Sequence, residues 1–167
     1  MFSFLSTKRS IEAAPYIRRV IDVTTPNRMT PQEGRRELRY NRSFPVTYCP
    51  WKKDTVFVEE VSIAFTQDLS DHGLGILSVQ PIEYDELVVS VWPDPVALSD
   101  PYHFLASVRD RRSAAAGIWA IGLMIEGFLN ESHRYELASL DKIARNVLQI
   151  DRSPNGTDRA VSTVRFK

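Results

Sequence analysis

Hydrophobic and polar residues alternate along the middle of the chain. Leu87, Val89 and Val91 occupy every second position, and the cluster around Pro93 ends that run. A period of two is typical of a half-buried strand, whereas residues 118–125 are apolar at nearly every position, which favours a central strand. The same reasoning predicts six short strands, at residues 43–48, 57–66, 75–79, 87–91, 104–108 and 118–125.

The period changes near residue 131. Apolar residues then recur at helical spacing, and Asn130 or Ser132 is the candidate N-cap. The stripe consists of Leu140, Ile143, Ala144, Val147 and Leu148. Six short strands joined by turns and followed by one helix predict a mainly β protein, a small antiparallel barrel or sandwich with a C-terminal helix.

The two ends of the chain are patterned more weakly. Ile17, Val20 and Ile21 share one face of a potential helix, whose length Pro15 and Pro26 limit. The tail is polar and rich in turn-forming residues, and we expect it to be flexible. The predicted organisation is an N-terminal extension that is partly helical or flexible, one domain, and a flexible tail, over residues 1–33, 34–150 and 151–167.

Composition narrows the range of partners. Hydrophobic residues make up 43% and charged residues 25%, an ordinary globular mixture. Lys+Arg and Asp+Glu both number 21, so the net charge is zero, which argues against a general DNA or RNA binder but not against a ligand with few phosphates. Cys49 is the only cysteine, which excludes an intrachain disulfide. No apolar run reaches the length of a signal peptide or a membrane span, so we expect a cytoplasmic protein.

Two motifs carry candidate chemistry. Arg35 and Arg39 have the spacing R-x-x-x-R just before the first strand, and Asp68, Ser70 and Gly73 have the spacing D-x-S-x-x-G at the end of the second. The planar arginine fork pairs with guanine O6 and N7, or with phosphate oxygens, by two parallel hydrogen bonds. An ionised aspartate accepts from guanine N–H donors, a serine both donates and accepts, and a glycine lets a ligand approach the backbone.

In this order, and around this strand pattern, the two motifs resemble those of the PilZ domain family. The resemblance covers roughly residues 34–150 and implies a six-stranded antiparallel β-barrel with a C-terminal α-helix. It also implies a receptor for the bacterial second messenger cyclic di-guanylate (cyclic di-GMP). Further matching segments are Phe44-Pro45-Val46, Gly73-Leu74-Gly75-Ile76, Val108-Arg109 and Ile121-Gly122, the last of these before Phe128.

The resemblance also implies roles for individual residues. Arg35 and Arg39 contact phosphate and guanine, while Asp68 and Ser70 face the ligand and Gly73 allows its approach. Both a single bound molecule and an intercalated pair remain open. Additional candidates for the same site are Arg36, Arg42 and Gly75.

We therefore expect a non-enzymatic receptor whose arginine segment closes over the nucleotide and signals to an unidentified protein effector. Ser70, Asp71 and His72 are the residue types of a catalytic triad. Because adjacent side chains on an extended chain point apart, these three cannot form the serine–histidine–carboxylate relay. The three histidines have no short metal-ligand spacing, so neither a metal nor a cofactor other than the ligand is expected.

Two alternative functions remain. The domain could be a PilZ-like protein-interaction module whose nucleotide site is silent. It could also be a barrel that binds single-stranded nucleic acid by stacking bases on Trp51, Trp92 and Trp119, although the zero net charge counts against that hypothesis.

Overall fold

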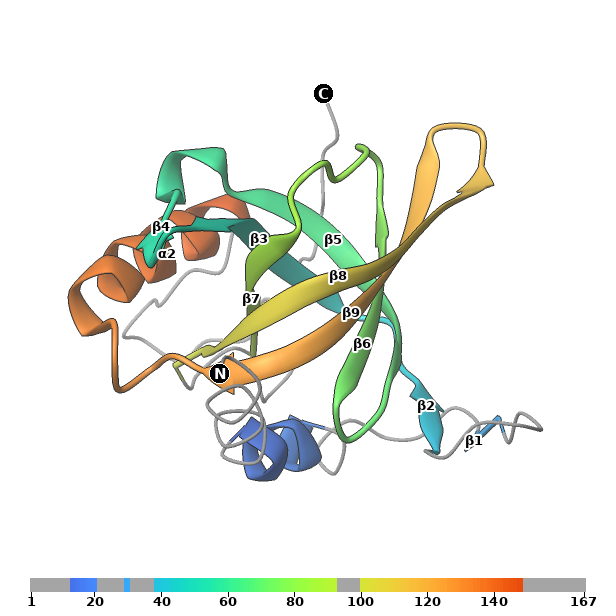
Figure 1. The fold of residues 1–167 in the computed structure, drawn as a ribbon, viewed down its shortest axis with the longest axis horizontal. Coiled ribbons are helices and arrows are strands. Elements are labelled where there is room, and N and C mark those ends of the chain that lie inside the picture. The colour runs from blue at the N-terminus through green and yellow to red at the C-terminus, as the bar shows by residue number, and fades with distance from the viewer. Residues whose placement is uncertain (1–12, 21–28, 31–37, 93–99, 149–167) are drawn as a thin grey trace, which may run out of the picture.

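The computed structural model describes residues 13–20, 29–30, 38–92 and 100–148. Within these ranges the chain forms a helix over residues 13–20, nine strands, a short 3-10 helix and a C-terminal helix (Figure 1). The elements after the first helix are β1 (Met29–Thr30), β2 (Arg39–Asn41), β3 (Pro45–Lys52), β4 (Thr55–Val56), η1 (Val58–Glu60), β5 (Ser62–Leu69), β6 (Gly73–Ser78), β7 (Glu86–Val91), β8 (Tyr102–Ala115), β9 (Ile118–Phe128) and α2 (Arg134–Val147).

Six of the strands close into a barrel. They follow one another around it in the order β5, β6, β9, β8, β7 and β3, and β3 pairs again with β5. All of these pairings are antiparallel. The predicted six-stranded antiparallel barrel with a C-terminal helix is therefore confirmed. Strands β1 and β2 extend the sheet beside β5, and β4 pairs with β3.

The observed strand boundaries differ from those predicted, most of all at the start of β5 and the end of β8. The segment predicted as a strand from residue 57 instead forms the helix η1 over Val58–Glu60, and β5 begins only at Ser62. Val58 and Val61 pack on the apolar cluster beneath α2, which draws this segment away from the sheet. Strand β8 continues far past residue 108 to Ala115, and residues 109–118 are exposed in a ribbon with β9 (Figure 1). A ribbon that buries no face has no alternation in its sequence to reveal it.

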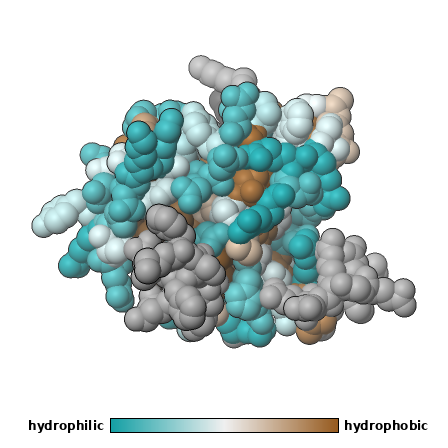
Figure 2. All heavy atoms as spheres, viewed as in Figure 1, coloured by the Kyte–Doolittle hydropathy of each residue, from teal (hydrophilic) through white to brown (hydrophobic). Residues whose placement is uncertain are grey.

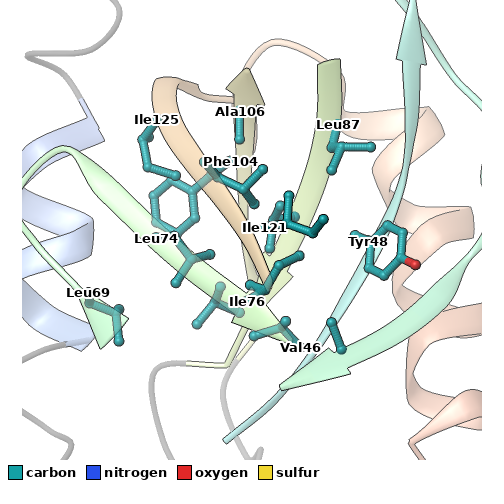
Figure 3. Packing of buried hydrophobic residues seen from close by; sticks show 14 of the residues in the cluster. Val46, Tyr48, Leu69, Leu74, Ile76, Leu87, Phe104, Ala106, Ile121 and Ile125 are labelled. Carbon is teal, nitrogen blue, oxygen red and sulfur yellow. The ribbon is translucent and has the colours of Figure 1, made fainter. Parts of the chain in front are cut away.

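The main core fills the barrel with alternate residues of its strands, as Figure 3 shows for Val46, Ile76, Leu87 and Ile121. The helix over residues 13–20 lies across one end of the barrel (Figure 1) and adds Ala13, Ile17 and Val20 to the same cluster. The predicted apolar face of this helix is therefore buried at Ile17 and Val20, whereas Ile21 lies outside the described residues.

Aromatic packing holds the same helix in place. The Tyr16 ring stacks on Phe128 with centroids 3.7 Å apart and meets Tyr102 edge-on at 5.3 Å. Both partners come from the barrel, at the start of β8 and the end of β9. Such ring pairs contribute roughly 0.5–1.5 kcal/mol beyond their buried area.

Helix α2 packs on the outside of the barrel. Of the predicted apolar stripe, Leu140 and Ala144 are buried, whereas Val147 is exposed; Leu137, which the prediction did not include, is buried as well. Leu140 packs in one cluster with Cys49 and Leu105. The predicted caps were wrong, because the N-cap is His133 and makes no side-chain capping bond. Asn130 is used elsewhere: its side chain accepts from the His103 backbone N–H and donates to the Pro101 carbonyl, both at 2.8 Å.

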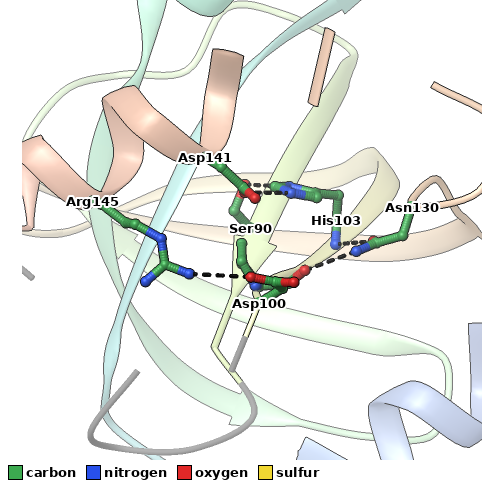
Figure 4. Close-up of polar contacts among 7 residues, drawn as sticks. Ser90, Asp100, His103, Asn130, Asp141 and Arg145 are labelled. Atoms are coloured by element: carbon green, nitrogen blue, oxygen red, sulfur yellow. Dashed lines mark hydrogen bonds and ion pairs between the residues drawn. The ribbon is translucent and has the colours of Figure 1, made fainter. Parts of the chain in front are cut away.

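A buried polar chain joins α2 to the barrel (Figure 4). His103 Nδ1 lies 2.8 Å from Ser90 Oγ, and His103 Nε2 lies 2.8 Å from Asp141 Oδ1 on α2. The residue types are those of a catalytic triad, but Ser90 is 0% exposed and a substrate cannot reach its hydroxyl. This chain therefore fixes α2 on the barrel.

The described surface is mostly polar on the face shown in Figure 2, with small hydrophobic areas near its centre. Among the helices that the structure describes, none is long and apolar enough to cross a membrane.

Cys49 gives a prediction about reactivity. Burial, with Glu59 and Glu60 nearby, raises the pKa of its thiol to about 12. Because only the thiolate reacts, the reactive fraction at pH 8 is roughly one in ten thousand, against about a quarter for an exposed cysteine. Iodoacetamide should therefore label the folded protein at least about a hundredfold more slowly than the protein unfolded in guanidinium. Mass spectrometry measures the two labelling rates. Equal rates in the folded and the unfolded protein would contradict the burial of this thiol.

Candidate functional site

Strand pairing brings parts of the two motifs together. Arg39 begins β2, and β2 pairs with the end of β5 through Tyr40 opposite Leu69 and Asn41 opposite Asp68. Arg39 thereby reaches Asp68, 29 residues later in the chain. Arg35 and Arg36, the other predicted arginines of the first motif, lie outside the described residues.

Arg39 and Asp68 form a half-exposed ion pair. Arg39 Nη1 lies 3.1 Å from Asp68 Oδ1 and 3.3 Å from Oδ2, with side chains 38% and 18% exposed. Only Nη1 takes part, and Nη2 and Nε make no hydrogen bond to the part of the chain that the structure describes. A pair this exposed contributes only about 0–1 kcal/mol, so contacts with a ligand could replace it at little cost.

Gly75 lets the Asp68 carboxylate lie against β6. An irregularity between Thr66 and Asp68 shifts the register, so that Asp68 is opposite Gly75. A Cβ at position 75 would lie 3.0 Å from Asp68 Oδ1 and 3.2 Å from its Cγ, closer than neighbouring atoms normally approach. Gly75, an additional candidate in the sequence, is therefore needed for the present position of this carboxylate.

The same outer face continues across a second glycine. Gly75 is opposite Gly122 on β9, and Gly122 is opposite Asp110 on β8. Two neighbouring strands thus lack side chains beside Asp68, and the Asp68 carboxylate covers the buried Gly75 while Gly122 lies against Asp110. A planar base can approach the backbone at Gly122, and at Gly75 once the carboxylate moves.

The turn from β5 to β6 carries the rest of the second motif. The Ser70 N–H donates to the Gly73 carbonyl at 2.9 Å, which leaves Asp71 and His72 as the loop. A Cβ at Gly73 would lie 3.1 Å from Ser70 Oγ and 3.3 Å from the Leu123 carbonyl. Ser70 is 5% exposed, and its hydroxyl makes no hydrogen bond to another described residue. Gly73 is therefore required by close packing, and the hydroxyl keeps its capacity to bond a ligand.

Arg42, another additional candidate, is built into the fold. Its guanidinium is buried, donates to the Asn41 carbonyl at 3.1 Å and lies 5.7 Å from the centre of the Tyr40 ring. Burial lowers the pKa of this guanidinium, and Tyr40 acts in the opposite direction. Thr66 Oγ1 donates to the Arg42 carbonyl at 2.6 Å and fixes the backbone there. A contact between Arg42 and a ligand stays a prediction.

A further arginine lies beside the site, and no pattern in the sequence indicates it. Arg18, on the helix over residues 13–20, lies 3.0 Å from Asp71 Oδ1 and 3.1 Å from Oδ2 through its Nη2. Its Nη1 donates to the Tyr40 hydroxyl at 3.3 Å. Asp71 stands at one of the unspecified positions of D-x-S-x-x-G, so the motif does not single it out. The docking of a distant helix leaves no local pattern in the sequence either.

Metal binding has no support in the described part of the chain, where no three His, Cys, Asp or Glu side chains are grouped to hold an ion. What the described residues offer is one arginine fork, one carboxylate, one hydroxyl and a glycine surface. These groups suit hydrogen bonding to a planar ligand that has both acceptors and donors.

Comparison with known proteins gives no family model and no curated protein that matches the chain. Among solved structures the chain is similar to the Bacillus subtilis inhibitor of motility MotI/DgrA, at 14% identity and a TM-score of 0.45, over 75% of this chain and 56% of that one. It is also similar to the PilZ domain with c-di-GMP of YcgR from Escherichia coli, at 18% identity and a TM-score of 0.35, over 68% of this chain and 96% of that one. One of these two solved structures is that of a PilZ domain.

Proposed function

We propose that this protein is a receptor for cyclic di-GMP that binds the nucleotide on the outer face of the barrel. The observation that carries the proposal is the pairing of Arg39 with Asp68 beside Gly75. Guanine presents acceptors at O6 and N7, which match an arginine fork, and N–H donors, which match a carboxylate. Arg39 therefore complements the acceptors of guanine, and Asp68 complements its N–H donors.

Binding replaces the internal ion pair by contacts with the ligand. Arg39 Nη2 and Nε, which bond none of the described residues, can bond guanine or phosphate, and Nη1 and the Asp68 carboxylate become available to the ligand as the pair opens. Ser70 lies in the turn from β5 to β6, directly after the strand that carries Asp68, and its hydroxyl adds a donor or an acceptor. Arg35, four residues before Arg39, supplies the second arginine of the motif in this proposal.

A different location on the described surface suits the ligand poorly. A cavity of about 420 Å³ lies between η1 and the loop after β6 and is lined by Glu59, Glu60 and Glu83 among others. Three carboxylates repel the two phosphates of cyclic di-GMP. Since Arg39 and Ser70 do not line that cavity, the motif site is the better candidate.

The first test is isothermal titration of the folded protein with cyclic di-GMP. Arg39→Ala should weaken binding by about 1–3 kcal/mol, roughly 5- to 150-fold, because a bidentate contact is lost. Arg134→Ala is the control, since Arg134 is an exposed arginine on α2 and belongs to neither motif. Absence of heat at high micromolar ligand would refute the proposed function. Unchanged affinity of the Arg39 variant would instead show that the site is elsewhere.

We further propose that a protein effector reads the bound state, because a nucleotide bound at Arg39 and Asp68 would change the surface that the barrel presents there. The PilZ resemblance implies effectors in motility, exopolysaccharide synthesis or virulence. A partner captured equally well with and without the nucleotide would favour the alternative of an interaction module with a silent site.

A further inference from the structure

The helix over residues 13–20 contacts the candidate site with both its polar and its apolar side. On the polar side, Arg18 reaches Asp71, in the loop between Ser70 and Gly73, and also the Tyr40 hydroxyl on β2. Tyr40 directly follows Arg39 in the chain. One guanidinium thus joins the two strand segments that carry the two motifs.

The apolar side of the helix meets the same turn from within the barrel. Ile17 and Val20 line a small apolar gap together with Leu69, Gly73 and Leu74, and both are buried. Leu69 directly precedes Ser70 at the start of the turn, and Gly73 stands at the end of the turn. Because Ile17 and Val20 pack in one cluster with Leu69 and Leu74, a shift of the helix is transmitted to the strands on both sides of the turn.

We propose that Arg18 is a positioning residue of the nucleotide site, and that docking of this helix and binding of cyclic di-GMP are coupled. The inference rests on the proposed function. The nucleotide needs Arg39 and the Ser70 turn at a fixed separation, and Arg18 holds Tyr40 and Asp71 at that separation. Coupling of this kind is reciprocal, so the bound nucleotide in turn stabilises the docked helix.

The strength of the Arg18–Asp71 pair alone does not account for helix docking. Its side chains are 47% and 42% exposed, and such pairs contribute little to stability. The buried Ala13, Ile17 and Val20 hold the helix on the barrel in any case. Replacing Arg18 should therefore leave the fold intact and change mainly the geometry of the turn.

A charge exchange tests the proposal in the full chain. Arg18→Glu and Asp71→Arg should each lower the affinity for cyclic di-GMP by about five- to tenfold, and the double variant should return to within about twofold of wild type. Arg19→Glu is the matched control, because Arg19 is the exposed neighbour of Arg18 on the same helix. A purely structural role of the helix would not give this pattern of loss and rescue.

Hydrogen exchange supplies a second readout. Cyclic di-GMP should increase the protection of backbone amides in residues 13–20 of the wild type, and less so in Arg18→Glu. Wild-type protein that binds the nucleotide, while Arg18→Glu and Arg19→Glu bind equally well, would overturn the coupling and leave the proposed function standing. Wild-type protein that does not bind at all would refute both.

Discussion

Gly75→Val should abolish most binding of cyclic di-GMP without unfolding the barrel. Even the first added carbon would lie 3.0 Å from Asp68 Oδ1, and the two methyl groups of valine require the carboxylate to turn away from Arg39. The carboxylate then no longer faces guanine, and the loss of its charged hydrogen bond to the ligand costs about 1.5–3 kcal/mol. We expect the affinity to fall about a hundredfold or more.

The fold should tolerate this substitution. Among the described glycines only Gly117 has a positive φ, of 74°, so the backbone at Gly75 suits an ordinary residue. Valine favours strands, and the atoms that it meets are the movable end of one side chain. The thermal midpoint should therefore stay within a few degrees of wild type.

Isothermal titration and thermal melting on the same samples separate the two effects. Gly75→Ala should give an intermediate loss, about tenfold, since it adds the first carbon alone. Leu77→Val is the control on the same strand, two residues further on. A folded Gly75→Val protein with wild-type affinity would mean that the ligand does not use Asp68 in its present position.

His103→Ala should be strongly destabilising, by about 3–5 kcal/mol, because it combines a cavity with a broken buried network. The side chain is 1% exposed and bonds Ser90 and Asp141 at 2.8 Å each. Removal leaves the Ser90 hydroxyl without its partner in a fully buried position. Asp141 is 28% exposed and can turn to water, so most of the cost arises on the barrel side.

Urea denaturation with linear extrapolation measures this loss. Ser90→Ala and Asp141→Ala each remove one hydrogen bond and should cost less, about 1–2 kcal/mol. His72→Ala, at an exposed loop histidine, should change the free energy of unfolding by no more than about 0.5 kcal/mol. If His103→Ala were no more destabilising than His72→Ala, the buried chain would not be what fixes α2.

The class of fold and the turn that carries the second motif could be predicted from the order of residues alone. Alternation of apolar residues revealed β7, because Leu87, Val89 and Val91 face the barrel core. It did not reveal that the other face of β7 is buried as well, at Val88 beneath α2. The apolar stripe revealed α2 for the same reason, as Leu140 and Ala144 show. The spacing of Asp68, Ser70 and Gly73 marked a turn, because a turn is encoded by neighbouring residues.

Features that depend on distant residues were decided by the tertiary structure. The approach of Arg39 to Asp68 follows from strand register, and the position of Asp68 over Gly75 follows from an irregularity in that register. The contact of Arg18 with Asp71 spans 53 residues, and the Ser90–His103–Asp141 chain joins β7, β8 and α2. Each of these side chains finds its partner only after the barrel has closed, because the chain carries no local pattern that pairs them.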